Sequence, residues 1–110
     1  MDNLDYQNII KETLIAYTKI PYSYGDIEYR PVFDSENHSY CLITLGWHDT
    51  KRIHGCLIHL EIIDDKIWVQ RDDTEDGVTY DLEAAGIPKD KIVLGFHPPY
   101  VRPHTGYAVA

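Results

Sequence analysis

The chain has 110 residues, of which 44% are hydrophobic and 25% charged, with 10 Lys and Arg against 18 Asp and Glu and a formal net charge of −8. This size and composition predict one folded domain over residues 1–110 and exclude a disordered chain, and the apolar runs are too short to span a membrane. Two cysteines cannot frame a disulfide-rich secreted fold, and the first residues lack a secretory pattern, so we expect a cytoplasmic protein.

The negative charge also restricts the partners. Nucleic-acid binding depends mainly on Lys and Arg side chains that neutralise phosphates. Here the ten basic residues are scattered, and protonating all six histidines would still leave the chain negative. Direct DNA binding by a monomer is therefore disfavoured, and a basic protein partner fits the charge better.

The N-terminal segment has the apolar spacing of a helix. Asp2 or Asn3 can cap its start, and Pro21 ends it because the residue before a proline is driven out of the helical region. The spacing of three and four residues predicts a helix over residues 4–20, with an apolar stripe formed by Leu4, Tyr6, Ile9, Ile10, Leu14, Tyr17 and Ile20.

From Ile27 the period changes to two, which is typical of strands. Pro31 predicts that the first strand lies at a sheet edge, because proline has no N–H for a ladder. Asp64 and Asp65 predict a tight hairpin turn between the third and fourth strands. The short polar turns favour an antiparallel meander. We predict strands over residues 27–33, 40–47, 52–62 and 66–70.

A short helical pattern follows over residues 78–85, and Gly86 suits the position just after a helix end. Residues 92–96 form a buried run that periodicity does not assign to a helix or a strand. The predicted class is α+β: an N-terminal helix packed on a mainly antiparallel four- to five-stranded sheet, with a second short helix. The apolar segment at residues 107–110 predicts docking either on this sheet or on a partner protomer, which would make a homo-oligomer.

A cluster of His54, Cys56 and His59 suggests metal or nucleophilic chemistry. On a regular strand His54 and Cys56 share one face and His59 points to the other, so one metal cannot be held by all three. The simpler interpretation is a small core cysteine with surface or hydrogen-bonded histidines. No catalytic constellation stands out elsewhere, and we predict no enzymatic activity, no cofactor and no metal site.

The segment from Asp72 to Glu83 contains six acids and no base. It matches part of a calcium-loop pattern, but Thr74 replaces the usual acid or amide and a strand precedes the loop, so an acidic turn capping the second helix is favoured. A solvated surface is the ordinary explanation of such a charge run, and steering of a basic partner is the functional one. The candidate partner-binding residues are Asp72, Asp73, Glu75, Asp76 and Tyr107.

Several unusual blocks point to a known family. They are Arg52-Ile53-His54-Gly55-Cys56, Lys66-Ile67-Trp68-Val69-Gln70, Asp72-Asp73-Thr74-Glu75, Ala85-Gly86-Ile87-Pro88-Lys89, Ile92-Val93-Leu94-Gly95-Phe96 and the final Tyr107-Ala108-Val109-Ala110. Across its length the chain resembles the fdxN element excision controlling factor family, XisI, which is found mostly in cyanobacteria. Asp73 and Tyr107 depart from the family pattern, where glycine and phenylalanine are expected.

The resemblance implies a regulatory role in the programmed excision of a DNA element in heterocyst-forming cyanobacteria. It implies that a separate recombinase cuts and joins the DNA, and that a companion, XisH, is encoded beside XisI. We therefore expect a non-enzymatic accessory factor that acts through an XisH-like companion and the recombinase. Two alternatives stay open: a small metal-dependent enzyme or nuclease subunit using His54, Cys56 and His59, and a dimeric DNA-binding regulator that gathers Lys51, Arg52 and Arg102.

Overall fold

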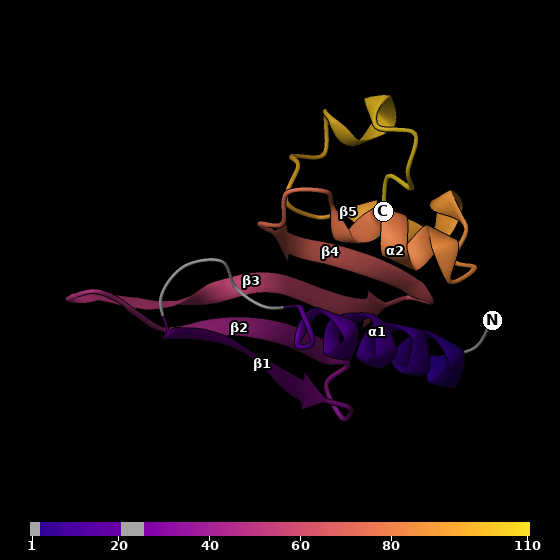
Figure 1. Ribbon diagram of the computed structural model, residues 1–110. Coiled ribbons are helices and arrows are strands. Elements are labelled where there is room, and N and C mark those ends of the chain that lie inside the picture. The colour runs from indigo at the N-terminus through magenta and orange to yellow at the C-terminus, as the bar shows by residue number, and fades with distance from the viewer. Residues whose placement is uncertain (1–2, 21–25) are drawn as a thin grey trace.

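Helices and a five-stranded sheet form two layers in the computed structural model, which describes residues 3–20 and 26–110 (Figure 1). This arrangement confirms the predicted α+β class. The elements in chain order are α1 (Asn3–Tyr17), β1 (Asp26–Asp34), β2 (Ser39–His48), β3 (Lys51–Ile63), β4 (Lys66–Asp72), α2 (Val78–Ala84), the 3-10 turn Lys89–Lys91, β5 (Ile92–Leu94) and the 3-10 turn Arg102–His104.

The sheet has the order β1-β2-β3-β4-β5. The first four strands form the predicted antiparallel meander, and β5 lies parallel to β4 after the crossover through α2. Pro31 lies on the edge strand β1, as predicted. Asp64 and Asp65 have φ values of 49° and 63°, so they form the two-residue hairpin turn between β3 and β4.

Both helices pack on the same face of the sheet. The predicted stripe of α1 supplies buried side chains from three successive turns. Helix α2 adds two more, which are four residues apart and therefore lie on one side of that helix. The sheet supplies the alternate residues of β2, β3 and β4. The buried core comprises Tyr6, Ile10 and Leu14 of α1, Tyr40, Leu42, Ile58, Leu60, Ile62, Ile67 and Val69 of the sheet, Val78 and Leu82 of α2, and Ile87, Ile92 and Leu94.

The first helix is shorter than predicted. It ends at Tyr17, and the next residues form tighter bonds in which the Thr18, Lys19 and Ile20 N–H groups each donate to the carbonyl three residues back. Such bonds satisfy carbonyls at a helix end. The predicted cap at Asp2 and the stop at Pro21 lie outside the described residues. No helix of the described ranges is long and apolar enough to cross a lipid bilayer.

The sheet face opposite the helices, here called the open face, follows from the strand register. Tyr40 pairs with Leu60 on the buried face, so their neighbours Cys41 and His59 pair on the open face. The open face comprises Asp26, Glu28, Arg30, Val32 and Asp34 of β1, Ser39, Cys41, Ile43, Leu45 and Trp47 of β2, Arg52, His54, Cys56, His59, Glu61 and Ile63 of β3, and Lys66, Trp68, Gln70 and Arg71 of β4.

The C-terminal segment lies against the β4–β5 end of this sheet, as predicted by the first of the two docking alternatives. The Ala108 N–H donates to the Ile92 carbonyl at 2.9 Å, and Ala108 bridges to Val93 in parallel. The Tyr107 hydroxyl donates to Glu83 Oε2 at 3.0 Å. The segment is therefore tied to both the sheet and α2.

Replacing residues 107–110 with Gly-Ser-Gly-Ser should lower the stability of the chain. The change removes the Tyr107 ring contact with the core and its hydrogen bond to Glu83, which together are worth at least about 1 kcal/mol. We expect a fall in Tm of about 4 °C or more in thermal unfolding followed by circular dichroism. An unchanged Tm would show that the docked segment contributes nothing to stability.

Candidate partner-binding groove

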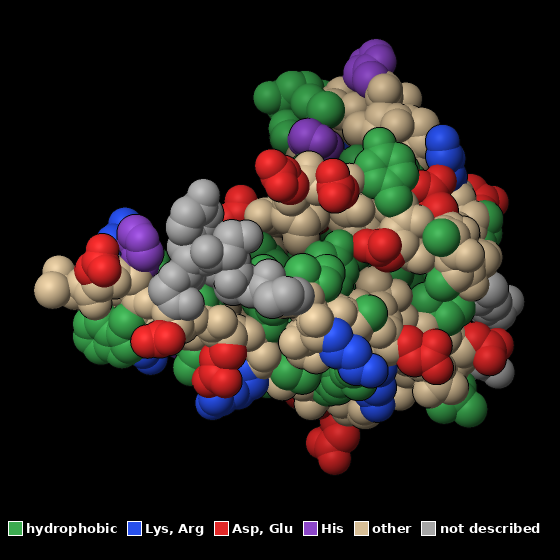
Figure 2. Space-filling view, in the orientation of Figure 1, with side chains coloured by type: hydrophobic (Ala, Val, Ile, Leu, Met, Phe, Trp, Pro, Cys, Tyr) green, Lys and Arg blue, Asp and Glu red, His purple; other side chains and the backbone are tan. Residues whose placement is uncertain are grey.

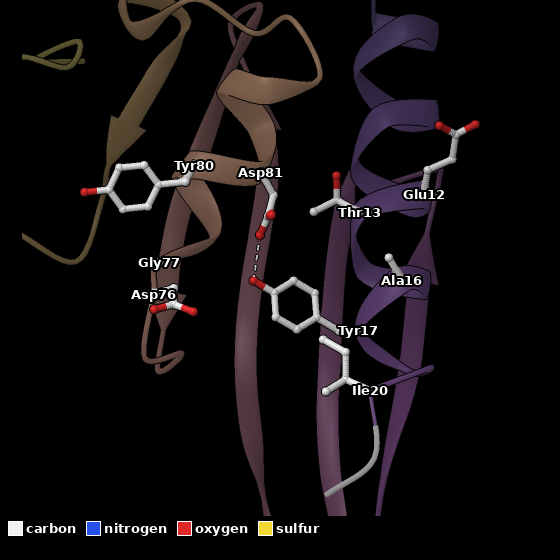
Figure 3. A pocket seen from close by; sticks show the side chains of 9 residues that line it. All are labelled: Glu12, Thr13, Ala16, Tyr17, Ile20, Asp76, Gly77, Tyr80 and Asp81. Carbon is white, nitrogen blue, oxygen red and sulfur yellow. Dashed lines mark hydrogen bonds between the residues drawn. The ribbon is translucent and has the colours of Figure 1, made fainter.

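A groove of about 470 Å³ lies between α1 and α2. Figure 3 shows Thr13, Ala16 and Tyr17 on α1, with Tyr17 pointing toward Asp81 on α2. Apolar atoms make up most of the wall, and two large side chains lie open to solvent: Ile20 is 55% exposed and Tyr80 is 67% exposed. The lining residues are Glu12, Thr13, Ala16, Tyr17, Ile20, Asp76, Gly77, Tyr80 and Asp81.

A second hollow, of about 460 Å³, continues this groove toward the start of β1 and the loop after β4. The two hollows share Tyr17, Ile20 and Asp76. The second is lined by Tyr17, Ile20, Tyr29, Leu57, Asp73, Thr74, Glu75 and Asp76. We call the combined surface the acidic groove, because its described lining includes Glu12, Asp73, Glu75, Asp76 and Asp81 and neither Lys nor Arg.

The acids of the groove surround apolar side chains. Figure 2 shows acidic side chains over α2 and the segment before it, beside exposed hydrophobic ones. Asp73 is partly neutralised by Arg71, whose guanidinium lies 3.6 Å from its carboxylate, while Glu75 and Asp76 are exposed. This combination of an apolar floor and a negative rim suits a partner segment that carries both apolar and basic side chains.

One hydrogen bond holds the two walls together. The Tyr17 hydroxyl donates to Asp81 Oδ2 at 2.7 Å, linking α1 to α2 across 64 residues of sequence. Burial of the phenol, together with this bond and the negative charge of Asp81, raises the pKa of Tyr17 above its ordinary value. The carboxylate of Asp81 is thus held at the groove by a neutral donor.

The side chain of Asp72 has a structural role at the start of α2. Gly77 precedes α2 with φ 89° and offers no side-chain cap. Asp72 supplies one from five residues upstream: its Oδ2 accepts from the Val78 N–H at 2.7 Å, and its Oδ1 accepts from the Thr74 N–H at 3.1 Å and from the Thr74 hydroxyl. This geometry agrees with the interpretation of an acidic turn that caps the second helix.

The five residues predicted to bind a partner therefore lie in different parts of the structure. Asp73, Glu75 and Asp76 line the acidic groove. Asp72 is turned inward to cap α2, and Tyr107 packs against the core with Lys89 5.7 Å from its ring centre. The structure brings three of the five together.

The predicted orientation of His59 is wrong. Leu42 pairs with Ile58 but Ile43 pairs with Cys56, so Leu57 is an extra residue, and this β-bulge reverses the alternation. As a result His54, Cys56 and His59 all lie on the open face. The Ser39 hydroxyl lies 2.8 Å from His59 Nε2, and Glu61 lies 3.9 Å from the same nitrogen.

The cysteines of the open face have the character of apolar residues. Burial, followed by the neighbouring Cys56 thiol, raises the pKa of Cys41 to about 11, so the thiol stays protonated near neutral pH. Within residues 3–20 and 26–110, no group of three or more His, Cys, Asp and Glu side chains is arranged to hold a metal ion.

Sequence reasoning missed Glu12, Tyr80 and Asp81 as part of the candidate site and assigned Tyr17 and Ile20 to the core stripe. Thr13, Ala16, Tyr17 and Ile20 follow the spacing i, i+3, i+4 and i+7, so they form the edge of that stripe that faces α2. The spacing could have located the wall, but the position of α2 was needed to complete it.

The chain is a small α+β domain with both helices on one sheet face and a groove between them. The model of the XisI protein family matches residues 1–109, and the chain belongs to this family. A crystal structure of a XisI-like protein from Anabaena variabilis ATCC 29413 is similar, with a TM-score of 0.88, 36% identity, and coverage of 97% of this chain and 98% of that one. No curated protein matches.

A second solved structure, from the same organism, is also similar to this chain. It is the fdxN element excision controlling factor XisI from Anabaena variabilis ATCC 29413. It has a TM-score of 0.80 and 30% identity, and the match covers 97% of each chain. These matches confirm the family that the sequence blocks indicated.

Removing the cap of α2 should destabilise the chain. Asp72→Ala leaves the Val78 N–H and the Thr74 hydroxyl without their acceptor, and we expect the free energy of unfolding to fall by about 1–2 kcal/mol in urea titrations. Asp76→Ala, a change of an exposed acid four residues further on, should stay within about 0.5 kcal/mol of wild type. Equal effects of the two changes would contradict the assignment of Asp72 as the cap.

The Tyr17–Asp81 bond predicts a dependence of stability on alkaline pH. A raised folded-state pKa means that the unfolded chain loses the phenolic proton first, so the contribution of Tyr17 is complete below about pH 10 and is lost as the pH rises further. Between about pH 10 and 12, the free energy of unfolding should fall less steeply in Tyr17→Phe than in wild type. Asp81→Asn, which keeps an acceptor but removes the charge, should give an intermediate slope; identical slopes in all three chains would refute the coupling.

Proposed function

We propose that this XisI family member is a non-enzymatic accessory factor that controls the site-specific excision of a DNA element by binding protein partners. The solved relative described as an excision controlling factor supports the process. The acidic groove supports the mode of action, because it offers an apolar floor and five carboxylates to a partner. An XisH-like companion and the recombinase are the proposed partners.

The groove is the observation on which this proposal depends. A groove lined by acids would repel the phosphates of DNA but would attract Lys and Arg of a protein partner. The exposed Ile20 and Tyr80 would be covered in such a complex, and exposed apolar side chains rimmed by polar ones are a feature of protein interfaces. The acids would guide the encounter, and the apolar floor would hold the bound segment.

Two of the three bases named for the alternative of direct DNA binding, Arg52 and Arg102, have other contacts. Arg52 lies over the Trp47 ring at 5.3 Å, and Arg102 lies over the Trp68 ring at 5.0 Å while its Nε donates to the His97 carbonyl. The strand register places Trp47 and Trp68 at opposite ends of the open face. Within one chain, these bases do not form a single patch.

The proposal predicts a salt-sensitive complex with the XisH-like companion. At 50 mM NaCl the two purified proteins should bind, and raising the salt to 500 mM should weaken the complex because exposed charges are screened. Replacing Asp73, Glu75 and Asp76 by Asn, Gln and Asn should raise Kd about tenfold, since three exposed ion pairs at about 0.5 kcal/mol each amount to about 1.5 kcal/mol.

A matched control removes the same charge elsewhere. Glu36→Gln, Asp49→Asn and Asp64→Asn together also change the net charge by three, at exposed turn positions outside the acidic groove. Kd measured by calorimetry should stay near the wild-type value. Equal weakening by both triple variants would mean that only total charge matters, and failure to bind at 50 mM NaCl would reject the XisH-like companion as the partner.

A further inference from the structure

The open face has a contiguous apolar centre on β1, β2 and β3. Val32 pairs with Cys41, Ile43 pairs with Cys56, and Leu45 lies in the next row on β2. Val32 is 52% exposed, whereas both helices are packed on the other side of the sheet. This centre is therefore an apolar surface that the described helices leave uncovered.

One end of the open face is already covered by another part of the same chain. At the β4–β5 end of the same face, Val93 is fully buried although it is not part of the main core, and it lies beside Ala108 of the C-terminal segment. Arg102, in the 3-10 turn that precedes this segment, stacks on Trp68 of β4. This cover reaches β4 and β5, while Val32 on β1 stays exposed.

The open face also differs from the rest of the molecule in charge. Its ionisable groups, apart from the histidines, are Arg30, Arg52, Lys66 and Arg71 against Asp26, Glu28, Asp34 and Glu61, so its net charge is zero. Glu28 and Arg30 form an ion pair within the face. The whole net charge of −8 therefore lies on other surfaces.

We propose that the open face is the interface of a homodimer, with a second copy of this chain as its occupant. Two copies that each carry a charge of −8 repel one another through their acidic surfaces, and contact through this neutral face keeps that repulsion smaller than contact through any acidic surface would. A twofold axis brings a patch onto itself, which requires self-complementarity. A neutral apolar centre bordered by equal numbers of acids and bases satisfies this requirement.

The size of the face sets the strength that we expect. The three uncovered strands β1, β2 and β3, spaced about 4.8 Å apart and about nine residues long, cover about 14 × 30 Å, or about 430 Å² per protomer. That is at the low end for specific interfaces, so the dimer should dissociate in the micromolar range. Added salt should strengthen it, because salt screens the repulsion between the acidic surfaces. The proposed complex with the companion responds to salt in the opposite direction.

Sedimentation velocity of the full chain from about 1 to 200 µM tests the proposal at the concentrations that such an interface requires. The mass of the wild type should rise from 12.7 kDa toward twice that value, and more readily at 500 mM than at 50 mM NaCl. Val32→Asp puts a charge into the apolar surface that the interface would bury and should weaken dimerisation at least tenfold. Arg30→Glu, a milder change that makes the face negative, should weaken it as well.

Ile15→Asp is the matched control, because Ile15 is 41% exposed on α1, on the opposite side of the sheet. It should dimerise like wild type, and unchanged melting curves at low concentration should show that the variants are folded. A wild-type chain that is monomeric at 200 µM, or a folded Val32→Asp chain that dimerises normally, would overturn the proposal. So would dissociation caused by Ile15→Asp, since the interface would then involve the helices. Binding of the companion is measured separately, so the two proposals can fail independently.

Discussion

The packing of α1 and α2 on one face of the sheet is the constraint from which the other surfaces follow. The two helices have 15 and 7 residues, and their buried side chains all point toward the same core. A small chain has limited apolar surface with which to cover a five-stranded sheet twice. One face is consequently covered by the helices. Among residues 3–20 and 26–110, the opposite face is covered at β4 and β5, by Arg102 and by the C-terminal segment. The acidic groove forms where the two helices lie side by side.

Local patterns in the sequence were sufficient to predict the main layers. The apolar stripe of α1 and the alternation of four strands are strong periodic signals, and Asp64-Asp65 carries the preference for positive φ that a two-residue hairpin needs. The strand β5 was not assigned because three apolar residues are too few to distinguish a strand from a helix. The bulge at Leu57 was also missed, because it depends on pairing with β2 and leaves no local signal. His59 was consequently placed on the wrong face.

The acidic groove could be predicted only in part, for a similar reason. Asp73, Glu75 and Asp76 are neighbours in sequence, so their negative charge is visible without a fold. Glu12 and Asp81 are separated by about seventy residues and line the same hollow only because both helices lie on one face. Within the acid run itself, the sequence does not distinguish Asp72 from Asp73. The difference comes from Gly77, which cannot cap α2 and leaves the Val78 N–H to an upstream carboxylate.

The two layers separate two kinds of surface. The helix side carries the acidic groove, whose described lining contains no base, whereas the open face carries no net charge and an apolar centre. A dimer formed through the open faces would therefore leave both grooves directed outward, on opposite sides of the assembly. Two identical grooves could engage two sites on one oligomeric partner, and the second contact would then form at a high effective concentration. In that assembly a modest affinity at each groove would be sufficient for stable association, which fits the accessory role proposed above.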